Sequence, residues 1–80
     1  ADLVVQSLTK YYDGHNMTVG GAVISRTKEL HDKMKFTLNM HGNCMHPHTA
    51  FLVLQTSKTM ELRILRQSAT AQKIAEALQK

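Results

Sequence analysis

The chain has 80 residues, 42% of them hydrophobic, and its 10 Lys and Arg residues outnumber its 6 Asp and Glu residues to give a net charge of +4. This length predicts a single domain over residues 1–80. The sequence has no apolar run of about 18 residues, which excludes a transmembrane helix. A single cysteine excludes an internal disulfide framework, so we expect a cytoplasmic or nuclear protein rather than a secreted one.

A β-hairpin is predicted over residues 3–25. Residues 3–12 are rich in β-branched and aromatic side chains, which predicts a strand. Asp13-Gly14 suits a tight turn, because glycine adopts positive φ at little cost. Residues 17–25 form the expected return strand, in which Gly20-Gly21 marks a bulge or weak pairing.

A short helical turn is predicted over residues 26–33, which are polar and charged. Glu29 and Lys33 are four residues apart, a spacing that favours a helix. The alternative is a longer helix over about 22–34, which would shorten the second strand. It is supported by four residues at helical spacing: Val23, Thr27, Leu30 and Met34.

Three further strands are predicted after this turn. In residues 34–41, apolar and polar side chains alternate strictly, which indicates a strand with one buried face. Residues 49–56 carry apolar side chains on both faces, which is typical of a central strand. A turn at residues 57–59 leads to residues 60–64, which alternate again.

The end of the chain predicts a helix over residues 68–80. Ser68 can cap its first turn, and a narrow apolar stripe follows, formed by Ala71, Ile74, Ala75 and Leu78. A helix this short is marginal alone, so we expect it to pack on the sheet. The fold class predicted is therefore α+β: an antiparallel sheet of four or five strands, made of hairpins, with the C-terminal helix on one face and a short helix near 26–33.

The stretch from Met40 to His48 has the highest density of metal-ligand side chains. We interpret it as a loop between two strands, and loops held by strands often carry function. Its candidate ligands are His41, Cys44, His46 and His48. Four ligands packed so closely along the chain wrap poorly around one zinc ion. A mixture of cysteine, methionine and histidine suits Cu(I) better. The alternative is a turn at Gly42-Asn43 followed by exposed histidines.

Catalysis is not expected from this sequence. A cysteine nucleophile needs a neighbouring base, and that base needs an orienting group. No acidic residue lies between Asp32 and Glu61, so Cys44 and His46 lack such a group. No glycine-rich phosphate loop or metalloprotease helix motif is present. The sequence therefore predicts a protein that is not an enzyme and has no cofactor, or else binds Cu or Zn.

The predicted function is a small binding module with a basic sheet face. Phosphate groups are the ligands that such a face attracts, with an affinity that falls steeply with salt. Nucleic acid or another polyanion is the expected partner, with a protein partner as the second choice. The expected contact residues are Lys35, His41, Lys58, Arg63 and Arg66. Free sheet edges also pair with a second copy, so a homodimer is a further expectation. The runner-up function is a small soft-metal-binding protein that uses the Met40–His48 stretch.

Overall fold

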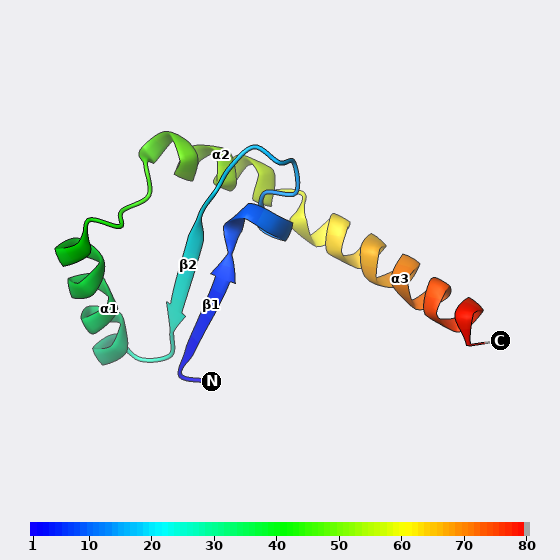
Figure 1. Ribbon diagram of the computed structural model, residues 1–80, viewed down its shortest axis with the longest axis horizontal. Helices are drawn as coiled ribbons and strands as arrows, with labels where there is room; N and C mark the ends of the chain where they lie inside the picture. The colour runs from blue at the N-terminus through cyan, green and yellow to red at the C-terminus, as the bar shows by residue number, and fades with distance from the viewer. Residues whose placement is uncertain (80) are drawn as a thin grey trace.

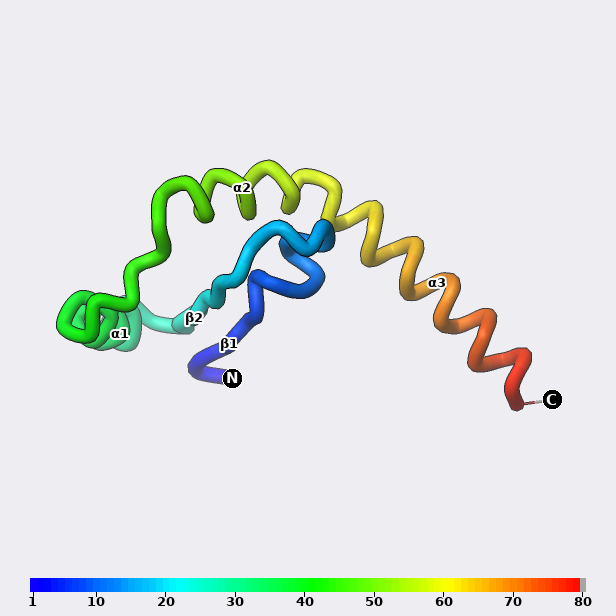
Figure 2. Tube along the Cα trace, turned by 45° about the horizontal axis from the view of Figure 1, so that its top comes forward, coloured from blue at the N-terminus to red at the C-terminus, as the bar shows by residue number. Residues whose placement is uncertain are grey.

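The computed structural model describes residues 1–79. Its elements follow in the order β1 (Leu3–Ser7), η1 (Leu8–Tyr12), β2 (Gly21–Ser25), α1 (Lys28–His41), α2 (Pro47–Ser57) and α3 (Met60–Leu78). Figure 1 shows the two strands at the centre, α1 on one side of them, α2 beyond their upper end, and α3 running away from the other elements. The turned view in Figure 2 shows the same projection of α3.

The predicted sheet of four or five strands is wrong. Residues 1–79 contain a single sheet of 2 strands, in the order β1-β2. The strands pair antiparallel from Leu3↔Ser25 to Ser7↔Gly21. The expected strand over 3–12 ends at Ser7, because the chain turns there into η1. The expected tight turn is therefore replaced by the long connection over residues 8–20, which begins with a hydrogen bond from Leu8 N to Gly20 O of 2.9 Å.

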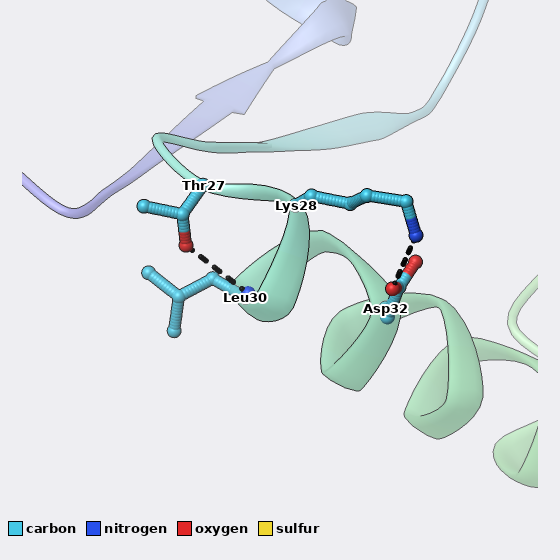
Figure 3. Close-up of polar contacts among 4 residues, drawn as sticks. All are labelled: Thr27, Lys28, Leu30 and Asp32. Atoms are coloured by element: carbon cyan, nitrogen blue, oxygen red, sulfur yellow. Dashed lines mark hydrogen bonds and ion pairs between the residues drawn. The ribbon is translucent and has the colours of Figure 1, made fainter.

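Helix α1 replaces the strand predicted over 34–41. Thr27 caps its first turn by accepting from Leu30 N at 3.3 Å, and Lys28 pairs with Asp32 at 2.8 Å (Figure 3). Met34 and Leu38 line a groove shared with β2. The intervening Phe36 is 67% exposed. The alternation of apolar and polar residues therefore does not mark a strand here: Met34 and Leu38 lie on the helix face that meets β2, and Phe36 lies on another face.

Helix α2 replaces the predicted central strand. Pro47 occupies its first turn, where a missing N–H costs nothing, and His46 caps it by accepting from His48 N at 3.1 Å. The buried and half-buried side chains recur at helical spacing: Thr49, Leu52, Val53 and Thr56. Val53, 8% exposed, is the only buried apolar residue in residues 1–79.

Helix α3 runs through the strand predicted at 60–64 and continues through the helix predicted from residue 68. It contacts η1 and α2, and Arg63 and Ile64 in its first turns are half-buried. Its remaining length does not pack on the sheet, and Leu78 is 82% exposed. The radius of gyration is 16.4 Å, against about 12 Å for a compact domain of this length. The single domain over residues 1–80 stays a prediction.

Among the described residues, no helix combines the length and the apolar character needed to cross a membrane.

Candidate functional site

Lys10 lies in η1, directly after the first strand. Asp13 N donates to Leu8 O at 3.0 Å across five residues, which is the π-helical pattern, and Gly14 N donates to Lys10 O at 2.8 Å. The helical path is interrupted at Lys10, where φ is -92° and ψ is -105°. We refer to residues 8–14 as the Lys10 turn.

The buried carboxylate of Asp13 supports the Lys10 turn from within. Asp13 is 0% exposed, and its Oδ2 accepts from Met17 N at 2.7 Å and Thr18 N at 2.8 Å. Burial raises the pKa of Asp13, but the hydrogen bonds from Thr18 and Met17 and the nearby His15 outweigh that effect and hold the pKa below its ordinary 3.8. The carboxylate therefore stays ionised at neutral pH and fixes the chain that follows the Lys10 turn.

Thr9 joins the Lys10 turn to the start of β2. Its hydroxyl accepts from Gly20 N at 3.0 Å and donates to Gly20 O at 3.3 Å. Both bonds span 11 residues along the chain. Leu8 N also donates to Gly20 O. The two ends of the connection over residues 8–20 are therefore joined by three hydrogen bonds to Gly20.

Arg63, on α3, holds the other end of the Lys10 turn. Its Nη1 donates to Tyr11 O at 2.6 Å, and its Nη2 donates to Tyr12 O at 3.2 Å. The same guanidinium donates to Thr56 O at 3.2 Å and, through Nε, to Thr59 Oγ1 at 3.1 Å. Four neutral acceptors from three segments therefore surround one cation.

The lysines of residues 1–79 fall into two groups. Three have a side-chain partner: Lys28 with Asp32, Lys33 with Glu29, and Lys58 with Gln55. Within the described residues, the side chains of Lys10, Lys35 and Lys73 have none. Lys35 and Lys73 sit in the middle of exposed helices. Lys10 differs because it follows a strand, in a turn fixed by contacts on both sides.

The predicted basic face does not form in the way the sequence indicated. Lys35 and His41 lie on α1, Arg63 and Arg66 on α3, and Lys58 between α2 and α3. None lies on a strand, so there is no sheet face to unite them. Arg63 instead uses its donors on main-chain carbonyls and a threonine hydroxyl inside the molecule.

The Met40–His48 stretch links two helices rather than two strands. His41 belongs to the last turn of α1, and His46 caps α2. Cys44 is exposed, and the ring of His48 stacks on Phe51 with centroids 6.4 Å apart. In the part of the chain that the structure describes, no three His, Cys, Asp or Glu side chains lie close enough to hold a metal ion.

Comparison with known proteins identifies the family of this chain. The sequence model of the family described as "Cys/Met metabolism PLP-dependent enzyme" matches residues 1–80. The chain belongs to this family. It is 40% identical over 79 residues to a cystathionine beta-lyase of Neurospora crassa, which covers 99% of this chain and 17% of that protein. It is 38% identical over 79 residues to a cystathionine gamma-lyase of Bacillus subtilis, covering 99% of this chain and 21% of the relative.

A third relative, a cystathionine gamma-synthase of Mycobacterium tuberculosis, is 40% identical over 78 residues, which are 98% of this chain and 20% of that protein. The chain thus spans about a fifth of the length of the relatives it matches.

Membership of this family of pyridoxal phosphate (PLP) enzymes overturns the functional predictions. A non-enzymatic module that binds nucleic acid or protein is wrong, and so is a protein with no cofactor or with Cu or Zn. The prediction failed because it required a complete set of catalytic side chains within the chain. In PLP enzymes the cofactor carries the difficult chemistry, and the protein supplies a lysine together with binding and orientation.

No cofactor role was predicted for Thr9 or Lys10, because residues 3–12 were interpreted as one continuous strand, and Asp13 was interpreted only as part of a tight turn. A signal was nevertheless present. Lys10 follows two hydroxyl residues in Ser7-Leu8-Thr9 and precedes Asp13-Gly14, so it lies where an apolar strand gives way to a polar turn. Side chains at such exits are common in functional sites.

Proposed function

We propose that the full-length protein is a PLP-dependent enzyme that acts on the carbon–sulfur bonds of a thioether amino acid such as cystathionine, and that Lys10 holds its cofactor. The match of the family model over residues 1–80 carries the proposal. The relatives named above support the substrate class, since each is named as a cystathionine lyase or synthase.

The chemistry and placement of Lys10 fit this cofactor. PLP is held in its enzymes through a covalent bond to a lysine ε-amino group. That lysine must present an amino group without a competing carboxylate and from a fixed backbone. Lys10 has no ion pair among residues 1–79, and its turn is tied to Gly20 through Thr9 and to α3 through Arg63. Lys28 and Lys33 do not meet the first requirement, because each is paired with a carboxylate.

Lys10 has two roles in the proposed reaction. Bound PLP supplies an electron sink for the carbon that bears the substrate amino group. Before substrate arrives, Lys10 Nζ holds the cofactor in place. Once the substrate amino group has taken that position, Nζ is free to accept or donate a proton as a general base or acid. The buried Asp13 and the Thr9 hydroxyl fix the backbone from which Lys10 projects.

The type of carbon–sulfur chemistry remains part of the proposal. Identities of 40%, 38% and 40% to a beta-lyase, a gamma-lyase and a gamma-synthase are too similar to separate the three. The products of cystathionine distinguish the two cleavages, because breaking the bond at the β-carbon yields pyruvate and breaking it at the γ-carbon yields 2-oxobutanoate. Formation of cystathionine from a cysteine thiol indicates the synthase reaction.

The proposal is tested with the full-length protein and the substitution Lys10→Ala. We expect Lys10→Ala to lose the visible absorbance of lysine-bound cofactor and the release of oxo acid from cystathionine. Lys73→Ala is the matched control, because Lys73 also has no side-chain partner in the described residues but lies on the projecting helix α3. Retention of both signals by Lys10→Ala, or their loss in Lys73→Ala alone, contradicts the assignment of Lys10.

We also propose that the full-length protein is a cytoplasmic homodimer. Its molar mass, measured by light scattering, tests the dimer. A nuclear location is not proposed, because it depended on the nucleic-acid binding that the family match overturns.

A further inference from the structure

The guanidinium of Arg63 donates hydrogen bonds to carbonyl groups at the ends of both η1 and α2. Tyr11 O and Tyr12 O lie at the C-terminal end of η1, and Thr56 O lies in the last turn of α2. The last carbonyl groups of a helix have no partner within it. They also carry partial negative charge, which favours a cation beside them. Arg63 supplies that cation from the second turn of a third helix.

Only an arginine can make this set of contacts. The guanidinium is planar and carries five N–H donors in a rigid fork, whereas a lysine ammonium is a compact point charge on a flexible stem. Three nitrogens of Arg63 reach four acceptors at 2.6 to 3.2 Å. None of these acceptors is a carboxylate: Arg63 binds three backbone carbonyl groups and one hydroxyl group, none of which has a formal charge.

The contacts of Arg63 act directly on the segment that carries Lys10. Tyr11 and Tyr12 are the two residues after Lys10, and their carbonyl groups are the ones held. The Lys10 carbonyl itself accepts from Gly14 N at 2.8 Å. Gly14 also leaves the space in which the guanidinium lies, because a Cβ at this position would overlap Arg63 Nη1. The carbonyl groups of the two residues after Lys10 are therefore held by Arg63, which lies more than 50 positions further along the chain.

We propose that Arg63 is a positioning residue for Lys10: by binding the Tyr11 and Tyr12 carbonyls, it sets the direction from which the lysine amino group meets the cofactor aldehyde. This inference rests on the proposed function, since it concerns the attachment of PLP to Lys10. The donors of Arg63 are directed to Tyr11 O, Tyr12 O, Thr56 O and Thr59 Oγ1, so its proposed role is to position Lys10. Through Arg63, the Lys10 turn is held in a fixed position relative to α2 and α3.

The test measures how fast PLP becomes attached to Lys10. Cofactor-free full-length protein is mixed with saturating PLP, the bond is fixed by borohydride at successive times, and the labelled peptide is quantified by mass spectrometry. We expect Arg63→Lys to lower the rate constant of attachment by about 10- to 100-fold, the size of effect that a misplacement of about 1 Å produces. Arg26→Lys, the same change at an exposed arginine that precedes α1, should keep the wild-type rate constant.

The amplitude and the rate constant separate positioning from loss of the fold. Unfolded molecules lower the final amount of labelled Lys10, whereas a misdirected lysine lowers the rate constant in molecules that still react. A wild-type rate constant in Arg63→Lys overturns the inference while leaving the proposed function intact. No label on Lys10 in the wild-type protein overturns both. Should Arg63→Lys not fold, Thr59→Val removes the single contact to Nε; a smaller slowing supports the inference and an unchanged rate constant refutes it.

Discussion

Gly14 and Gly42 form a matched pair that isolates the contribution of the Arg63 contact. Both adopt the left-handed conformation, with φ of 65° and 69°. A Cβ at Gly42 meets no atom within 4 Å, whereas a Cβ at Gly14 overlaps the guanidinium of Arg63. The backbone cost of alanine is therefore the same at the two sites, and only Gly14→Ala displaces the guanidinium of Arg63 from its hydrogen bonds.

The magnitudes follow from these geometries. Alanine in the left-handed region costs about 1–2 kcal/mol, so Gly42→Ala should lower the free energy of unfolding by that amount. Gly14→Ala also displaces Arg63 from the carbonyls of Tyr11 and Tyr12. Hydrogen bonds from a charged donor contribute about 1.5–3 kcal/mol each. The guanidinium is the movable end of a long side chain and its bond to Tyr11 O is exposed, so we take about 0.5–1 kcal/mol for each of the two bonds, which gives a total of about 2–4 kcal/mol for Gly14→Ala.

Urea unfolding of the full-length protein, measured for both variants, provides the assay. An additional comparison introduces Gly14→Ala into an Arg63→Ala background, where the contact is already absent. There the cost of Gly14→Ala should fall to that of Gly42→Ala, which reveals the coupling between the two positions. Equal costs for Gly14→Ala and Gly42→Ala in the wild-type background would refute the reasoning, and so would a cost of Gly14→Ala that is independent of Arg63.

Other contacts around the Lys10 turn give further predictions. Thr9→Val should lower the free energy of unfolding by about 1–3 kcal/mol, because it leaves Gly20 N without its acceptor; an unchanged urea midpoint would contradict this. Asp13 has a pKa below its ordinary 3.8 when folded, so its stabilising effect is present above that pH and is lost as the pH falls through the lower folded value. Asp13→Asn should therefore flatten the acid side of the stability profile, and a profile as steep as that of the wild type argues against this role. Thr27→Ala removes the cap on Leu30 N and should cost about 1 kcal/mol, with no change in the rate of cofactor attachment.

Helix α1 shows why the sequence pattern was misinterpreted. Met34 and Leu38 are four residues apart, which is one turn of a helix and also two repeats of a strand. Phe36 and Met40 fill the alternate positions, but both are exposed, at 67% and 70%. Exposed apolar residues therefore completed a false strand pattern.

The Met40–His48 stretch carried interpretable signals of a different kind. Gly42 is the left-handed residue that ends α1, and Pro47 occupies the first turn of α2. Glycine after a helix and proline at the start of the next form a recognised boundary pattern. The apparent metal-binding character came from histidines that occupy the same boundary, one of which caps α2. A helix–loop–helix interpretation was thus available from Gly42 and Pro47 alone.

The candidate site was harder to predict, because it depends on contacts between distant residues. The roles of Arg63 and Gly14 follow from hydrogen bonds that span 51 and 52 positions, and nothing local to Arg63 distinguishes it from Arg66. The tight turn expected at Asp13-Gly14 is part of the longer connection over residues 8–20, and its contacts with the Lys10 turn became evident only in the structure. The cofactor became evident only from the match of the family model over residues 1–80.

The most direct test of this account locates the lysine that carries the cofactor. Full-length protein loaded with PLP is reduced with borohydride, digested, and mapped by mass spectrometry. The account predicts that the reduced cofactor is found on Lys10, in stoichiometric amount, and on no other lysine of residues 1–79. Label on Lys35, Lys73 or a lysine outside this segment, with Lys10 unmodified, would contradict it.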